Sequence, residues 1–122
     1  MCDTRFTRIS DLYGSVLDAI PDMLVLYDKD ATILDIVHPK PELMPDGPEA
    51  FIGRRLTEAG MEQVAGSSAG QLEAVIRSRK PGRSVFRHKG RKSGRIRYYE
   101  VFLSRLETDR VLADIRTIHE ES

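Results

Sequence analysis

The chain lacks most of the features that would assign it to a specialised class of protein. Only one of its 122 residues is a cysteine, Cys2, so neither an internal disulfide nor a cysteine-based metal motif can form. No apolar run approaches the roughly 20 residues that a membrane span requires. Charged residues between Asp3 and Arg8 also interrupt any signal-peptide pattern. We therefore expect a cytoplasmic domain that makes no membrane contact of its own.

The charges are balanced, with 19 Lys and Arg against 19 Asp and Glu, which gives a formal net charge of zero. The net charge therefore says nothing about partners. A hydrophobic fraction of 40% over 122 residues predicts one domain. Such a chain buries roughly two-thirds of its unfolded surface, so it needs neither a metal nor a disulfide to fold.

Apolar residues near the N-terminus recur at three- and four-residue spacing, which predicts an amphipathic helix over residues 1–20 that ends before Pro21. The apolar positions are Phe6, Ile9, Tyr13, Val16, Leu17 and Ile20. This apolar stripe could pack on the chain's own sheet, pair with a second copy, or do both. We expect a homodimer.

Two short apolar runs, residues 23–27 and 33–37, are predicted to form a pair of strands. The first run is wholly apolar, which is typical of a strand covered on both faces. The second is β-branched and apolar apart from Asp35. Residues 28–31 supply the polar turn between them, in which Asp30 tolerates unusual backbone angles.

Four prolines exclude long regular elements from residues 38–48, where we expect an irregular segment with one short helical turn. Residues 61–79 then return to a helical period, although Gly66 and Gly70 interrupt it. We expect one helix from 61 to 79. The alternative is a helix that breaks near Ser67.

Three further strands are predicted over residues 84–89, 96–106 and 111–118. The longest should carry Tyr99, Val101 and Leu103 on one face and Tyr98, Phe102 and Leu106 on the other. The order of elements is helix, two strands, irregular segment, helix and three strands. That order favours an α+β fold with an antiparallel sheet over alternating βαβ units.

This ordered series resembles a PAS domain over nearly the whole chain. "AIPDMLVLYDKDATILDI" is similar to the family's opening hairpin, and "FIGRRL" to the segment before its long helix. "AVIRSRKPG" is similar to the end of that helix, and "FRHKGRKSGRIRYYEVFLSRL" to the central hairpin. "VLADIRTIHE" lies where the family ends its last strand. The family's Asp-Ile-Thr motif is replaced here by Thr117, Ile118 and His119, so its acidic member is missing.

The resemblance implies a five-stranded antiparallel sheet with helices packed on one face and a small cavity between sheet and helices. It also implies that signal leaves through the N-terminal helix or through a helix that continues from the last strand. Candidate walls of the cavity, which could equally be plain core, are Leu24, Leu26, Ile36, Phe51, Ile52, Leu56, Leu72, Ile76, Tyr99, Val101 and Leu103.

No cofactor is predicted, although an unidentified small-molecule ligand remains open. A haem-binding member of the family needs a histidine on the long helix, and residues 61–79 contain none. Covalent flavin chemistry needs a cysteine beside the flavin ring, and the terminal Cys2 cannot serve. We expect no metal site.

The run Gly-Ser-Ser-Ala-Gly at residues 66–70 matches the pattern of a nucleophile elbow. An elbow follows a strand, and no strand is predicted before this run, so we expect no catalytic residue. We instead expect these small residues to allow a helix to approach the sheet closely.

A basic band extends from Arg77 to Arg97, with ten Lys and Arg and no Asp or Glu. One interpretation is a solvated surface that acids from elsewhere in the fold neutralise. The other is a site for an anionic partner: an acidic protein surface, or a carboxylate or phosphate ligand. Nucleic acid is disfavoured, because no set of base-stacking aromatic residues accompanies the charges.

The resemblance divides the chain into a flanking helix used for dimerisation (residues 1–20), a PAS domain (21–120) and the beginning of an output linker (121–122). It implies a regulatory sensor module of a bacterial signalling protein, either a histidine kinase of a two-component system or a cyclic-dinucleotide enzyme. The module would sense a small molecule or a partner and act on an effector domain in the parent chain. The alternative is a ligand-free module for dimerisation and scaffolding.

Overall fold

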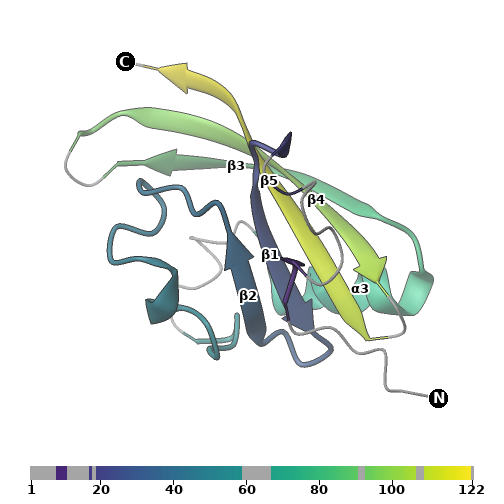
Figure 1. Cartoon of the computed structure of the whole chain (residues 1–122). Coiled ribbons are helices and arrows are strands. Elements are labelled where there is room, and N and C mark those ends of the chain that lie inside the picture. The colour runs from purple at the N-terminus through teal and green to yellow at the C-terminus, as the bar shows by residue number, and fades with distance from the viewer. Residues whose placement is uncertain are drawn as a thin grey trace.

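A computed structural model shows five antiparallel strands in one sheet, with the strand order β2-β1-β5-β4-β3 (Figure 1). It describes residues 8–10, 17, 19–58, 67–90, 93–106 and 109–121. The strands are β1 (Met23–Asp28), β2 (Ile33–Val37), β3 (Gly82–Lys89), β4 (Ile96–Leu106) and β5 (Arg110–Glu121). The predicted α+β fold with a five-stranded antiparallel sheet is confirmed. The strand predictions hold to within three residues at every end.

The sheet buries side chains on both faces, and β1 shows this most clearly. Met23, Val25 and Tyr27 belong to the larger buried cluster, which lies on the face that α3 covers; we call this the inner face. Leu24 and Leu26 alternate with them and belong to a second cluster on the opposite, outer face. The wholly apolar run at residues 23–27 therefore corresponds to a strand that is buried on both faces of the sheet.

Helix α3 (Ala69–Ser78) lies behind the sheet in Figure 1 and contributes Leu72 and Val75 to the inner cluster. It begins after Ser68, whose hydroxyl accepts the Gln71 N–H while the Gln71 side chain accepts the Ser68 N–H. This reciprocal cap satisfies two donors that a helix start leaves unpaired.

The prediction of one continuous helix over residues 61–79 is therefore wrong, and the break near Ser67 that the alternative expected is present. Ser67 and Ser68 are not helical, because the Ser68 backbone is extended where its side chain caps the helix. Residues 61–66 lie outside the described part of the chain.

The turn between β1 and β2 is organised by Asp28, whose Oδ1 accepts the N–H groups of Asp30 and Thr32 at 2.9 and 3.0 Å. The left-handed position is Ala31, with φ of 63°, and not Asp30 as the sequence suggested. A side chain that accepts two backbone donors sets this turn without a glycine.

The segment after β2 is irregular, as its prolines predict, apart from the 3-10 turn Pro48–Ala50. It then returns to the sheet and covers the edge of β2 that faces away from β1. The Ile33 N–H donates to the Arg54 carbonyl at 2.9 Å, and the Gly53 N–H donates to the Ile33 carbonyl at 2.8 Å. Thr32 and Arg55 form a β-bridge beside them.

Most of the predicted N-terminal helix lies outside the described residues, so it stays a prediction. Ile9 and Leu17, two positions of its apolar stripe, are buried in the outer cluster with Leu24, Leu26 and Leu112. The Ile9 N–H donates to Asp35 Oδ2 at 2.7 Å. These parts of the N-terminal segment therefore pack on the chain's own sheet, in front of β1 in Figure 1.

We expect the substitution Ser68→Ala to lower the free energy of unfolding by about 1 kcal/mol, because it removes the helix cap of α3. Chemical denaturation monitored by circular dichroism measures the loss. Ser104→Ala, at an exposed position of β4, is the matched control. If Ser68→Ala cost no more than the control, a helix that begins at Ala69 would be contradicted.

Candidate functional site

The structure gathers most of the eleven candidate cavity walls on the inner face. Six are buried there: Ile36, Leu56, Leu72, Tyr99, Val101 and Leu103. Phe51 and Ile76 pack against the same cluster and are partly buried.

Three candidates lie elsewhere. Leu24 and Leu26 point to the outer face, because side chains alternate along a strand and Met23, Val25 and Tyr27 take the inner positions. Ile52 is 41% exposed, one residue beyond the 3-10 turn and its cap. Leu24 and Leu26 therefore cannot line an inner-face cavity together with the other candidates.

The structure shows a hollow of about 210 Å³ at the margin of the inner face, between α3 and the beginning of β3. Its lining is mainly apolar and includes Val75, Pro81 and Leu103, together with the polar Gln71 and Lys80. Gly82 lets the strand approach the helix, since a Cβ built there would lie 3.2 Å from a methyl carbon of Val75. The hollow is open to solvent and lies beside the predicted cavity.

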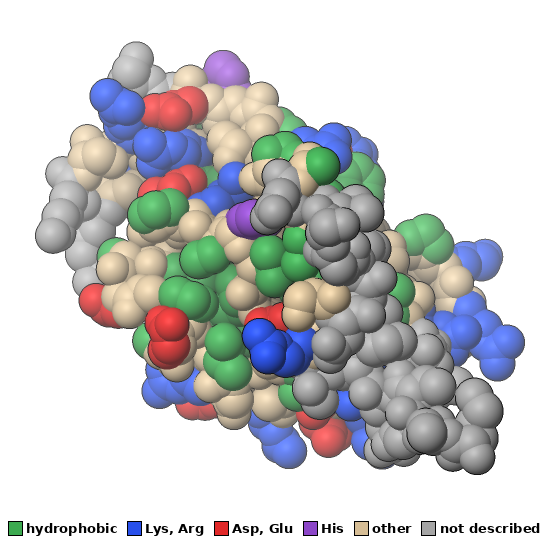
Figure 2. Space-filling view, in the orientation of Figure 1, with side chains coloured by type: hydrophobic (Ala, Val, Ile, Leu, Met, Phe, Trp, Pro, Cys, Tyr) green, Lys and Arg blue, Asp and Glu red, His purple; other side chains and the backbone are tan. Residues whose placement is uncertain are grey.

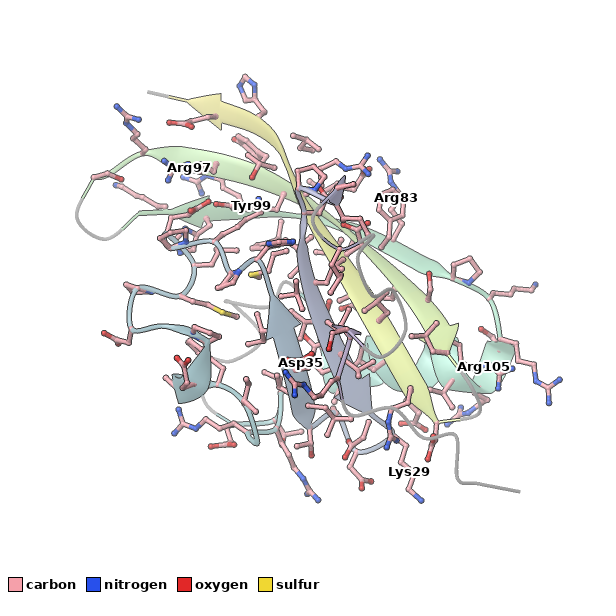
Figure 3. All side chains as sticks on the ribbon, in the orientation of Figure 1. Lys29, Asp35, Arg83, Arg97, Tyr99 and Arg105 are labelled. Atoms are coloured by element: carbon pink, nitrogen blue, oxygen red, sulfur yellow. The ribbon has the colours of Figure 1, made fainter. Side chains whose placement is uncertain are left out.

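A polar and aromatic cluster occupies the other end of the inner face. Tyr99 is fully buried, and its hydroxyl donates to Glu42 Oε2 at 2.7 Å (Figure 3). The Phe86 ring stacks on Tyr99 with 5.0 Å between ring centroids, and the His88 ring meets its edge at 6.5 Å. His88 Nδ1 is buried and has no hydrogen-bond partner within the described ranges. We call Glu42, Phe86, His88 and Tyr99 the Tyr99 cluster.

The electrostatics of the cluster keep Tyr99 protonated and Glu42 ionised. Burial, followed by the hydrogen bond to Glu42, raises the pKa of the Tyr99 hydroxyl. Burial also acts to raise the pKa of Glu42, but the Tyr99 hydrogen bond and the charges of Arg97 and Lys40 outweigh it and lower this pKa. A neutral donor and a charged acceptor form a strong hydrogen bond. The cluster can therefore orient a polar group that enters beside it.

The sequence reasoning missed Glu42, Phe86 and His88 as members of this site. The pairing register sets Phe86 opposite Tyr99, so alternation along β3 could have placed Phe86 and His88 on the face of Tyr99. Nothing in the sequence signals Glu42, because its contact with Tyr99 joins residues 57 apart across the irregular segment.

Tyr99 also connects this cluster to the end of β5. It pairs with Thr117, whereas its neighbour Tyr98 pairs with His119, so the register shifts by one residue between them. Ile118 is the extra residue of this β-bulge and is 47% exposed. The positions that match the family's Asp-Ile-Thr motif are therefore part of a strand and contain a bulge.

The outer face carries a pair of carboxyl groups between the beginning of β1 and β5. Asp22 and Asp114 interact with each other, and this interaction favours the protonated form of the Asp114 carboxyl group. Arg116 Nη2 lies 3.4 Å from Asp22 Oδ2, and the positive charge of Lys40 acts on the same pair. Burial, then the hydrogen bond with Asp22 and its charge, raise the pKa of Asp114 to about 6.

None of these groups forms a recognisable catalytic or metal-binding set. Within the described ranges, no group of three or more His, Cys, Asp and Glu side chains could hold a metal ion. Ser68, from the elbow-like run, caps α3. His38 Nε2 lies 2.9 Å from the Leu17 carbonyl oxygen, and the His119 ring lies against Tyr98. The described helices are too short and too polar to cross a bilayer.

The basic band is neutralised in part. Arg77 pairs with Glu73, Arg83 pairs with Glu100, and Arg95 and Arg97 both pair with Glu120. Within the described part of the chain, Arg79, Lys80, Arg87 and Lys89 are exposed and have no carboxylate within ion-pair distance. Figure 2 shows Lys and Arg side chains at the right margin, where α3 leads into β3.

Comparisons with known proteins give one family match and several solved structures of similar fold. The family described as PAS fold matches residues 17–121. The PAS domain of an HTR-like protein from Haloarcula marismortui is 23% identical, with a TM-score of 0.59 over 89% of this chain and 91% of that one. The photoactive yellow protein domain of the sensor histidine kinase Ppr from Rhodospirillum centenum is 19% identical, with a TM-score of 0.65 over 84% and 97%.

A third solved structure, the PAS domain of BvgS from Bordetella pertussis, is 16% identical with a TM-score of 0.59 over 91% of this chain and 87% of that one. A search of curated protein sequences finds no significant match. At these identities the solved structures support the fold alone, and the family match covers most of the chain.

We expect Asp114 to contribute a fall in the free energy of unfolding as the pH rises from about 4 to about 6. Its folded pKa of about 6 lies above the ordinary value of 3.8, so in this range the folded protein keeps a proton that the unfolded chain has released. Asp114→Asn removes this titration and should both flatten the pH dependence and stabilise the fold at pH 7. Urea unfolding at several pH values measures both effects.

Asp46→Asn, at an exposed carboxyl group in the irregular segment, is the control and should keep the wild-type slope. Equal slopes for the wild type and Asp114→Asn between pH 4 and 6 would contradict the raised pKa of Asp114.

Proposed function

The chain belongs to the PAS family, and on this premise we propose that it is a regulatory sensor module of a bacterial signalling protein. In this proposal the domain binds a small molecule on the inner face of its sheet and performs no chemistry on it. The parent protein would be a histidine kinase or a cyclic-dinucleotide enzyme. The similarity in fold to a domain of a sensor histidine kinase supports the first of these.

The observation that carries the proposal is the Tyr99 cluster. It combines two aromatic rings, an ionised carboxylate and a buried His88 nitrogen without a partner among the described residues, at one end of an otherwise apolar face. Ligand sites in proteins have this composition, with an apolar lining and a few fixed polar groups. A ligand with an aromatic or apolar body and one hydrogen-bonding group fits the chemistry of the cluster.

The position of Tyr99 in the sheet supports a route for the signal from the inner face to the end of β5. A ligand that competes for the Tyr99 hydroxyl would alter its bond to Glu42 on one side and its pairing with Thr117 on the other. A β-bulge lies next to this pair, and bulges mark places where a strand can bend. The end of β5 is therefore the element that we expect to respond.

The alternative function, a ligand-free module for dimerisation and scaffolding, is favoured by the packing of the inner face. Seventeen buried hydrophobic residues form one contiguous cluster there. The hollow beside α3, at about 210 Å³, is smaller than the roughly 300–1,000 Å³ that drug-sized ligands occupy. In this case the N-terminal segment and the outer face would form the dimer.

We expect at least one member of a metabolite panel to raise the thermal stability of the wild-type chain. A ligand at a hundred times its dissociation constant stabilises by about 2.7 kcal/mol. The same ligand should stabilise Tyr99→Phe far less, because that variant lacks the hydroxyl that Glu42 holds. Thermal-shift titration of both proteins measures the difference.

Tyr98→Phe changes the neighbouring tyrosine, whose side chain faces the opposite side of the sheet, and is the matched control. Equal stabilisation of all three proteins would exclude the Tyr99 cluster as the site. No stabilising ligand, together with a dimer in light scattering, would favour the scaffold.

A further inference from the structure

The two edges of the sheet differ in whether other parts of the chain cover them. The β2 edge is paired with residues 53–55 through backbone hydrogen bonds and a β-bridge. The β3 edge has no backbone partner of this kind within the described ranges. β3 is also the longer of the two, with eight residues, no internal proline and an unbroken register with β4. A regular edge strand with one unpaired side can pair with a strand from another chain.

The hydrogen-bond pattern of the β3–β4 hairpin identifies which backbone groups point outward. The Gly90 N–H donates to the Arg95 carbonyl at 2.8 Å, next to the Lys89–Ile96 pair. Hydrogen-bonded pairs alternate along an antiparallel ladder, so Phe86 and His88 exchange hydrogen bonds with β4. The N–H and C=O groups of the alternate residues, from Arg83 to Lys89, are directed away from β4.

The side chains of these outward-directed residues share the outer face of the sheet. They are Arg83, Val85, Arg87 and Lys89, and all four are exposed, Val85 by 52%. Arg83 is paired with Glu100, whereas Arg87 and Lys89 have no ion-pair partner among the described residues. The edge therefore presents one apolar position followed by two unneutralised cations.

We propose that the β3 edge binds an extended acidic segment of a partner protein, which adds to the sheet as a sixth strand. The outward backbone groups of β3 would supply the hydrogen bonds. Carboxylates on the added strand would lie opposite Arg87 and Lys89, and an apolar side chain opposite Val85. Arg79 and Lys80, which are exposed just before β3, extend the positive potential toward the approaching segment.

The charge pattern selects an acidic partner over a second copy of this chain. If two β3 edges paired antiparallel about Val85, Arg83 of each copy would face Arg87 of the other; about Arg87, the two Arg87 side chains would face each other. Like charges directly opposite one another destabilise a strand pair. The same cations that prevent self-association at this edge therefore attract an acidic strand.

A fluorescent heptapeptide tests the proposal against the intact chain. It carries glutamate at the two positions that face Arg87 and Lys89, valine at the position that faces Val85, and threonine between them. We expect saturable binding in fluorescence anisotropy that weakens with added salt. Arg87→Glu should weaken binding roughly tenfold, because it replaces attraction by repulsion. Lys29→Glu, at an exposed turn remote from β3, should leave the affinity unchanged.

Two further tests separate strand addition from attraction between charges. Val85→Pro removes an outward N–H and no hydrogen bond to β4, so a folded Val85→Pro variant should lose roughly tenfold in affinity. A peptide with the same side chains but N-methyl groups on its glutamate and valine residues should bind the wild-type chain as poorly.

Three outcomes would overturn the proposal. They are equal affinity of the N-methylated and parent peptides, equal affinity of the Arg87→Glu and wild-type chains, and displacement of the peptide by an oligothymidylate of equal charge at equal concentration. The first two hold even if Val85→Pro fails to fold.

Discussion

The burial of β1 on both of its faces is the constraint on which the rest of the fold depends. β1 lies between β2 and β5, and its side chains alternate between two apolar clusters. A strand of this kind is stable only when the sheet is covered on each side. Helix α3 supplies one cover, and Ile9 and Leu17 of the N-terminal segment contribute to the other. The first cover comes from the middle of the chain and the second from its N-terminal segment.

The strands could be predicted from the sequence because short apolar or alternating runs bounded by turn residues are local patterns. The start of α3 was missed although the sequence contains the cap: Ser68 and Gln71 have the spacing of a capping box, and the helical period of residues 61–66 obscured it. Leu24 and Leu26 were assigned to the inner face because a wholly apolar strand gives no sign of which side is which. Glu42 could not be predicted, since its partner is fixed only by the tertiary fold.

The basic band shows how one charge pattern in a sequence can divide between two roles in a structure. Four of its arginines, including Arg83 and Arg97, form ion pairs with glutamates, and this part of the band follows the interpretation of a neutralised surface. Arg87 and Lys89 alternate along an edge strand, where neighbouring positions point to opposite faces of the sheet. The charges of Arg87 and Lys89 lie on the same face, because residues two positions apart in a strand point to the same side of the sheet.

β4 connects the basic edge strand β3 to β5, because it pairs with β3 on one side and with β5 on the other. Tyr99 lies opposite Phe86 in the first pair and opposite Thr117 in the second. Any displacement of Tyr99 on the inner face must therefore be accommodated in both ladders, since the backbone hydrogen bonds fix the register on each side. The bulge at Ile118 lies in the second ladder, and the first is regular. The β5 side can absorb such a displacement at lower cost in backbone hydrogen bonds, and we therefore propose that a change at the Tyr99 cluster is transmitted toward the end of β5.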